Sequence, residues 1–211
     1  MTRIMNRKMT CFICGKQSEY HVLLSTNFSG SPDLDLRRHG MGRSTIGEWV
    51  HECPHCGYVN SSVEEKTVVS AEFFNSYEYV SCDGLRLPSK TAKKYYRLYM
   101  LRLRENDYDG ALYAITRAAW ACDDASVEGL AMLCREKAVE IIENHCPPTT
   151  EEEFCVYADT LRRCGRFSKV IEILTDFPAE DLLIKQIMAF QVKLSHKKDM
   201  GVYTVEDACG A

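Results

Sequence analysis

The C-terminal part of the chain, from residue 89 onward, carries apolar residues at helical spacing. Tyr95 and Tyr99 fall on one face of a first helix, because residues four apart share a face. Thr150 and Glu153 form a capping-box pattern that starts a later helix, and Gly165 ends it. The same periodicity predicts further helices at residues 109–122, 126–144, 150–164, 168–175 and 180–195, followed by a flexible tail at 197–211.

Two of the turns between these helices are alike. Tyr108 and Phe167 each stand between a polar turn and a new amphipathic helix, as in the turn of a tetratricopeptide helix pair. The two aromatic residues are 59 positions apart, which is not a multiple of the roughly 34-residue tetratricopeptide period. The helical part is therefore predicted to be an irregular, tetratricopeptide-like antiparallel domain.

The N-terminal part shows a different pattern, in which short apolar runs are separated by turn residues. Residues 1–10 are predicted to be a flexible lead-in, and residues 20–25 and 49–50 to be strands. Residues 26–47 are rich in Gly, Ser, Asn, Asp and Pro, which predicts a long loop between the strands. Residues 61–88 favour neither helix nor strand, but their aromatic side chains are expected to pack the helices against the strands.

Two Cys-x-x-Cys-Gly motifs flank the predicted strands. Four thiolates are the ligand set of a closed structural zinc site, and the glycine after each second cysteine permits the tight turn that such a site needs. The sequence therefore predicts one structural Zn²⁺ held by Cys11, Cys14, Cys53 and Cys56. A thiol–disulfide motif and an iron site are the alternatives, and His51 and His55 are nearby alternative ligands.

These patterns together predict an α+β protein. Residues 1–88 would form a small zinc-ribbon-like β domain, and residues 89–196 the helical domain. The ribbon's loop is longer than in most ribbons, and long loops in compact domains are often binding elements. Its candidate interaction residues are Asp33, Asp35, Arg37, Arg38 and Arg43. The alternatives to a binding role are turn capping, ion pairing, cation binding or acid/base catalysis for the aspartates, and solvated surface for the arginines.

Composition and charge restrict the class of protein. The chain has 211 residues, eleven of them cysteine, and a net charge of −4. An odd number of cysteines, with two pairs at metal-binding spacing, favours a reducing cytosol over a disulfide framework. No apolar run is long enough to span a membrane. Neither half has the excess of positive charge that drives phosphate binding, and the basic stripe on the first helix, Lys93, Lys94, Arg97, Arg102 and Arg104, is predicted to be solvated.

Several segments resemble an uncharacterised bacterial family, a domain of unknown function. The likeness rests on residues 31–37, 41–46 and 49–58, the last of which contains the second cysteine motif, and on residues 117–120. Leu36 departs from the family pattern, in which a Thr-Arg pair is expected at this point. The resemblance implies a four-cysteine zinc ribbon, a helical part similar to tetratricopeptide repeats and a bacterial cytosol. It implies no activity, because the family has no established one.

The sequence contains no phosphate loop, nucleotide-binding glycine fingerprint, nucleophile elbow or His-Glu-x-x-His motif. We therefore expect a non-catalytic, cytoplasmic interaction module that binds a protein or peptide through its loop and its helices. Two alternatives stay open, which are a zinc ribbon that binds nucleic acid and a thiol-based redox or zinc sensor. The sequence leaves the partner and the oligomeric state undetermined.

Overall fold

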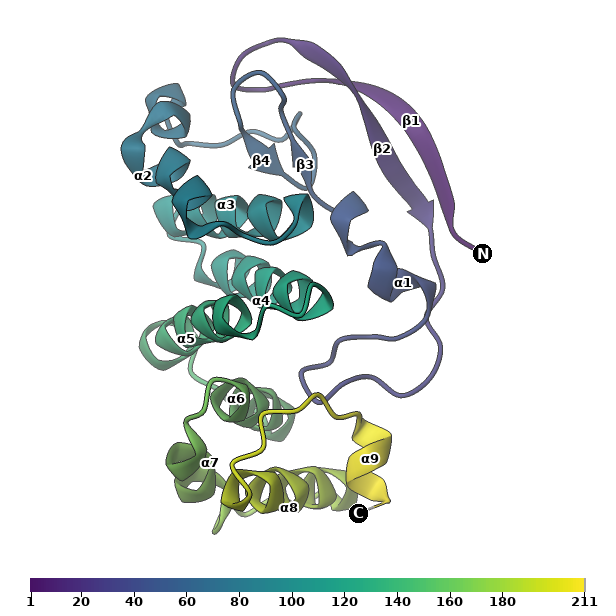
Figure 1. The fold of residues 1–211 in the computed structure, drawn as a ribbon, viewed down its shortest axis with the longest axis vertical. Helices are drawn as coiled ribbons and strands as arrows, with labels where there is room; N and C mark the ends of the chain where they lie inside the picture. The colour runs from purple at the N-terminus through teal and green to yellow at the C-terminus, as the bar shows by residue number, and fades with distance from the viewer. Residues whose placement is uncertain (211) are drawn as a thin grey trace. The chain divides into compact units, whose positions relative to one another are not determined.

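The computed structural model describes residues 1–210, apart from the side chain of Asp83, and has an α+β fold (Figure 1). Its strands form two antiparallel hairpins, one from β1 (Arg3–Thr10) and β2 (Gln17–Ser25), the other from β3 (His51–Glu52) and β4 (Val59–Asn60). The longer helices are α3 (Lys90–Arg104), α4 (Tyr108–Asp124), α5 (Glu128–Asn144), α6 (Glu151–Arg163), α7 (Phe167–Leu174) and α8 (Leu182–His196). Short helices are α1 (Met41–Ser44), α2 (Tyr77–Val80) and α9 (Val205–Cys209), and 3-10 turns cover Ile46–Glu48, Ala71–Asn75 and Ser81–Leu85.

The helices begin and end close to where their sequence signals placed them. Thr150 and Glu153 form the predicted capping box at the start of α6. Gly165 follows α6 with a φ of +80°, a conformation that glycine adopts without steric cost. The local signals were sufficient here because caps and periodicity act within a few residues of each helix.

The predicted flexible lead-in is instead a strand. β1 pairs with β2 along its whole length, from Arg3 opposite Ser25 to Thr10 opposite Gln17. Of the eight residues in β1, only Met9 is buried. The strand therefore lacks the apolar alternation that reveals a strand in a sequence, and it exists through its backbone pairing with β2.

The chain divides into two compact units that do not follow the predicted boundary at residue 88. The first unit comprises Met1–Asn27 and Ser44–Cys134, and the second comprises Phe28–Arg43 and the chain from Arg135 onward. The middle of the long loop thus belongs with the C-terminal helices and not with the ribbon. We refer to these parts below as the first and the second unit.

In the first unit, α3 packs against the hairpin β3–β4 through both apolar and polar side chains. Tyr95 is fully buried, and its hydroxyl donates to the carbonyl oxygen of Ile46 at 2.8 Å. The ammonium group of Lys94 donates to the carbonyl oxygens of Gly47 and Val50, each at 2.8 Å. The predicted solvated stripe on α3 is therefore wrong for Lys94, which is half-buried, and for Arg97, which is buried.

Three of the four aromatic side chains of residues 61–88 are buried and pack next to the second cysteine turn, as predicted, whereas Tyr77 is 89% exposed. Phe74 packs edge-on against Tyr58 with ring centroids 5.2 Å apart, and against Tyr79 at 5.3 Å. Tyr79 is fully buried, and its hydroxyl donates to the carbonyl oxygen of Gly57 at 2.7 Å. This segment consists of short helical turns, which have too few residues to show a period.

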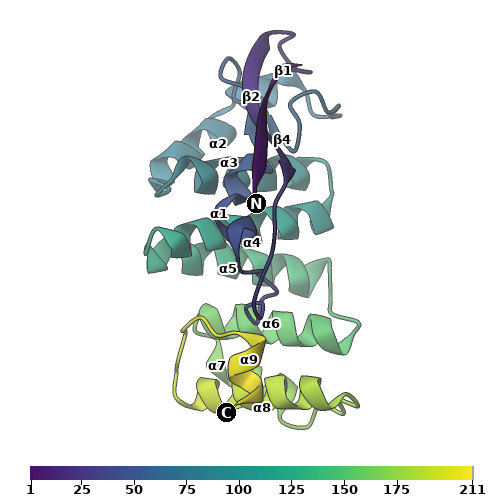
Figure 2. The ribbon, with the colours of Figure 1, turned by 90° about the vertical axis from the view of Figure 1, so that its right-hand side faces the viewer.

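In the second unit, the middle of the long loop is joined to the C-terminal segment. Asp33 forms an antiparallel bridge with Thr204, and the amide of Leu34 donates to the carbonyl oxygen of Tyr203 at 2.9 Å. α9 lies against α8, with Ala208 buried (Figure 2). Residues 197–210 are thus ordered by contacts and are not the predicted flexible tail, whose last residue, 211, lies outside the described residues.

Candidate metal centre

The two hairpins bring the four motif cysteines together at their turns. Every one of these sulfur atoms lies within 4.8 Å of the other three, and the group consists of Cys11, Cys14, Cys53 and Cys56. Within residues 1–210, no other group of three or more His, Cys, Asp or Glu side chains meets this condition. The first cysteine of each pair is buried and the second is partly exposed. The site is therefore closed on its inner side and reaches the surface on the other.

The two turns have the same backbone structure. The amide of Cys11 donates to the carbonyl oxygen of Lys16, and the amide of Gly15 donates to that of Cys11, both at 2.9 Å. Cys53 repeats this pattern with Tyr58 and Gly57, at 2.8 and 2.9 Å. Gly15 and Gly57 have φ angles of +67° and +74°. The predicted need for glycine after each second cysteine is confirmed.

The spacing of the sulfur atoms fits a tetrahedral metal ion and not a disulfide. Cys11 and Cys56, from different hairpins, have their sulfurs 3.6 Å apart, and so do Cys14 and Cys53. A metal–sulfur bond of about 2.3 Å gives an edge of roughly 3.8 Å in a tetrahedron of sulfurs. A disulfide needs a separation of about 2.05 Å. Four soft donors at these separations suit a thiophilic ion.

Without a cation, burial makes two of the four thiols harder to ionise. Burial raises the pKa of the Cys11 and Cys56 thiols above their ordinary value. Burial acts on Cys14 in the same direction, but the backbone N–H of Lys16 and the neighbouring cysteines stabilise its thiolate and lower its pKa. A divalent cation favours all four thiolates together, so its binding releases protons and strengthens with rising pH.

The nearby histidines do not take part in the sulfur group. Both ring nitrogens of His51 face backbone carbonyl oxygens, Nδ1 that of Ser61 at 2.6 Å and Nε2 that of His21 at 2.9 Å. His55 points away from the centre of its turn, with Nε2 3.3 Å from the hydroxyl of Ser18. The four-cysteine set is the better description of the ligands, as the sequence indicated.

Residues far along the chain hold the second turn in place, and sequence reasoning missed them. Arg102 donates to the side-chain oxygen of Asn60 at 2.6 Å, and Asn60 donates to the hydroxyl of Tyr58 at 2.9 Å. Arg97 pairs with Glu52 of β3. A helical projection could have indicated part of this, because Arg97 lies one turn before the fully buried Leu101.

The candidate interaction loop is not an open binding surface. Asp33, Asp35 and Arg37 are buried, with 2%, 7% and 2% of their surface exposed. One oxygen of Asp35 lies 3.1 Å from the guanidinium of Arg163 on α6, and the other accepts from the amide of Arg37 at 3.2 Å. Ion pairing within the protein and, for Asp35, turn capping are the roles that the structure assigns to these carboxylates, and both are alternatives that the sequence left open.

The remaining loop residues are also engaged. Asp33 accepts from Arg43 at 2.7 Å and lies 2.5 Å from Nε2 of His39. Arg38 is exposed, and its guanidinium lies 5.2 Å from the ring centroid of Phe28. His39 has no thiol or hydroxyl partner among the described residues, so its pair with Asp33 is not part of a nucleophile–base set.

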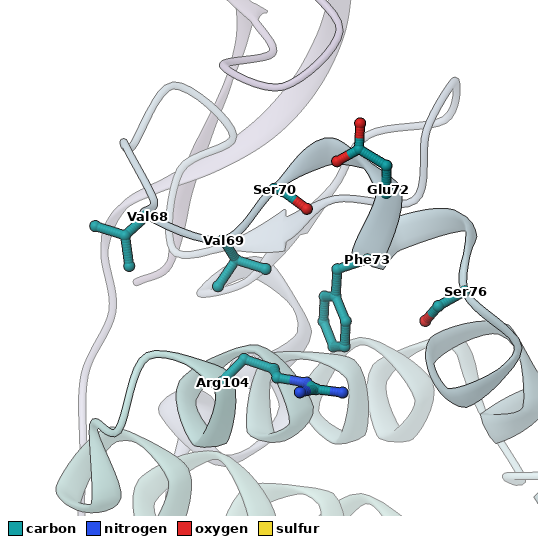
Figure 3. A pocket seen from close by; sticks show the side chains of 7 residues that line it. All are labelled: Val68, Val69, Ser70, Glu72, Phe73, Ser76 and Arg104. Atoms are coloured by element: carbon teal, nitrogen blue, oxygen red, sulfur yellow. The ribbon is translucent and has the colours of Figure 1, made fainter.

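A pocket of about 420 Å³ lies in the first unit, where residues 68–76 pass over the end of α3 (Figure 3). Phe73 points down onto the guanidinium of Arg104, whose central carbon is 5.2 Å from the ring centroid. Arg104 also pairs with Glu78. The lining contains neither cysteine nor histidine. Its one carboxyl group is that of Glu72, whose pKa is lowered by a hydrogen bond from Ser70.

The remaining cysteines do not extend the centre. Among them, Cys122, Cys134, Cys155 and Cys164 are buried, as predicted for small apolar side chains. Burial raises the pKa of Cys155 to about 12, so this thiol stays protonated at neutral pH. None of the eleven cysteines is in a disulfide.

Comparisons of the chain with protein-family models, curated proteins and solved structures find no match. The resemblance to the bacterial family therefore stays a prediction. No helix of the described chain combines the length and the apolar character that crossing a membrane requires.

We predict that Gly15→Ala weakens metal binding about tenfold, since a left-handed backbone costs a residue with a Cβ about 1–2 kcal/mol. No atom lies within 4 Å of the added Cβ, so the effect is purely conformational. Competition with a zinc-binding dye measures the affinity. Gly129→Ala, on α5, also adds its Cβ in open space and is expected to leave the affinity unchanged. Equal affinities for the two variants would contradict this account of the turn.

Proposed function

We propose that this chain is a non-catalytic, zinc-binding interaction module of the cytoplasm, in which one Zn²⁺ braces the ribbon and the helices contact a protein partner. The observation that carries the proposal is the tetrahedral grouping of the four cysteine sulfurs. A site with four protein ligands leaves no open position at which a metal ion could activate water or a substrate. The role of the metal is then to stabilise a hairpin pair that is too small to hold a core of its own.

The rest of the proposal concerns what the helices do. A tetratricopeptide-like pairing of helices within one unit, such as α3 with α4 or α6 with α7, would offer a concave face to a peptide, and membership of the bacterial family would fit both halves of the chain. The pair of His39 and Asp33 in the loop has no thiol or hydroxyl partner among the described residues, which favours binding over catalysis there. Nucleic-acid binding through the loop arginines loses support, because Arg37 is buried and Arg43 is paired with Asp33.

Native mass spectrometry of the protein, purified gently under reducing conditions, tests the proposal. We expect one zinc ion per chain and a protein companion at a fixed ratio. Cys14→Ser should lose the zinc, whereas Cys209→Ser, which removes an exposed thiol outside the centre, should keep it. A metal-free chain, an iron chromophore, or bound nucleic acid in place of a protein would each contradict the proposal.

A further inference from the structure

A groove of about 360 Å³ lies in the second unit, between the end of α7 and the side of α8. Leu174 and Phe177 line one wall, and Met188, Ala189 and Val192 line the other. Lys185 is the one charged residue of the lining. The groove is therefore apolar, with a single cation among its walls.

The floor of the groove is fixed in position by the core of the second unit. Leu174 and Met188 are 5% and 4% exposed. The ring of Phe177 packs on that of Phe154, with centroids 4.7 Å apart. A surface supported in this way does not have to be ordered when a ligand binds, which is a property of preformed sites.

The apolar surface continues along α8 beyond the groove. Leu182 is 71% exposed, and it lies on the same helical face as Lys185 and Ala189, because their spacings are three and four residues. An exposed leucine in line with an apolar groove gives a linear surface, and the segment that matches such a surface is an amphipathic helix with anchors about one turn apart.

The charges along α8 indicate the kind of helix, while Asp176 and Glu180 are exposed on the segment that precedes α8. Lys185 and Lys193 are exposed, and neither ammonium group has an ion-pair partner within residues 1–210. The lining includes no carboxylate. A partner carrying carboxylates beside its apolar anchors would complement both lysines, whereas a basic partner would be repelled.

We propose that the α7–α8 groove binds an acidic amphipathic helix of a partner protein. Apolar side chains of that helix fill the groove between Phe177 and Val192, and its carboxylates pair with Lys185 and Lys193. This inference rests on the proposed function, because it places the partner of the interaction module on one surface. It places the partner on a surface other than the long loop, in which Asp33, Asp35 and Arg37 are buried.

Fluorescence anisotropy with a labelled synthetic helix tests the proposal. The probe is about 15 residues long, enough for four helical turns, with leucine and phenylalanine on one face and glutamate elsewhere. Ala189→Glu and Lys185→Glu are each expected to weaken binding about tenfold or more, as for anchor positions of interfaces. Lys66→Glu is the matched control, since it makes the same charge change at an exposed lysine of the first unit, and it should leave binding within about twofold.

Several results would overturn the proposal. The first two are absence of probe binding to the wild-type chain, and groove variants that bind the probe as tightly as the wild-type chain does. The other two are loss of binding in Lys66→Glu, and tighter binding of a probe that carries lysine in place of glutamate. Dimerisation of the wild-type chain that Ala189→Glu abolishes would assign the groove to a second copy. Because the metal centre lies in the other unit, zinc content and the native companion report on the proposed function separately. If both groove variants retained the native companion, the proposed function would stand and only the groove proposal would be overturned.

Discussion

Replacing Cys53 by serine should abolish metal binding and unfold the two hairpins. Cys53 is fully buried and contributes one of the four sulfurs, so the variant has a three-thiol site with a hydroxyl that binds zinc poorly. Structural zinc sites in small peptides contribute an apparent free energy of about 10–16 kcal/mol at pH 7. That is comparable to the whole stability of a typical domain, about 5–15 kcal/mol.

The loss should extend into the first unit but not through the second. Tyr79 connects the second turn to the helices, because its hydroxyl donates to the carbonyl oxygen of Gly57. This hydrogen bond is lost when the turn unfolds. Hydrogen exchange measures this, with fast exchange expected in β1–β4 and retained protection in α6 and α8. Cys209→Ser is the control. A Cys53→Ser variant that keeps its zinc and its protected hairpins would show that the centre has been assigned wrongly.

The second large effect is expected for Arg162→Ala on α6. Arg162 is fully buried and makes three hydrogen bonds, to the side chains of Gln191 and Asp159 at 2.7 and 2.6 Å and to the carbonyl oxygen of Asp199 at 2.7 Å. Truncation leaves the carboxylate of Asp159, only 2% exposed, without its cation. Removing one partner of a buried ion pair costs about 3–5 kcal/mol.

Urea unfolding followed through the second unit measures this loss as a lower transition midpoint. Arg166→Ala is the matched control, because Arg166 is 43% exposed on its side chain and lies 3.9 Å from Glu143. An exposed pair of this kind contributes about 0–1 kcal/mol. If the two variants unfolded at the same urea concentration, the buried network would not hold α6, α8 and the segment at Asp199 together.

The two predictions concern parts of the chain that the sequence revealed to different degrees. The cysteine ligands were evident from spacing alone, since two residues between cysteines place both sulfurs on one turn. The network of Arg162 was not, because an arginine in the middle of a helix has the same local signature whether it is buried or solvated. What distinguishes the buried Arg162 from a solvated arginine is its hydrogen bond to Gln191, which is 29 residues away in the chain.

The same reason explains why the candidate interaction loop was misjudged. A segment rich in Gly, Ser, Asp and Pro predicts a loop, and the structure contains one. Its carboxylates looked available because their partners are remote: Asp35 pairs with Arg163, 128 residues along the chain. The surface that we propose for binding, in contrast, consists of ordinary apolar residues of α7 and α8, and no local signal separates a groove from a core.

The sequence by itself determined the helices α3–α8, the capping box of α6, and the identity of the four cysteines of the candidate metal centre. These features depend on interactions within a few residues, such as the hydrogen bond between Thr150 and the amide of Glu153. Only the tertiary structure decided that β1 is a strand, that the loop belongs to the second unit, and that Lys94 is half-buried. Each of these depends on backbone or charged groups that find their partners far along the chain, and the pattern of apolar and polar residues does not encode such pairings.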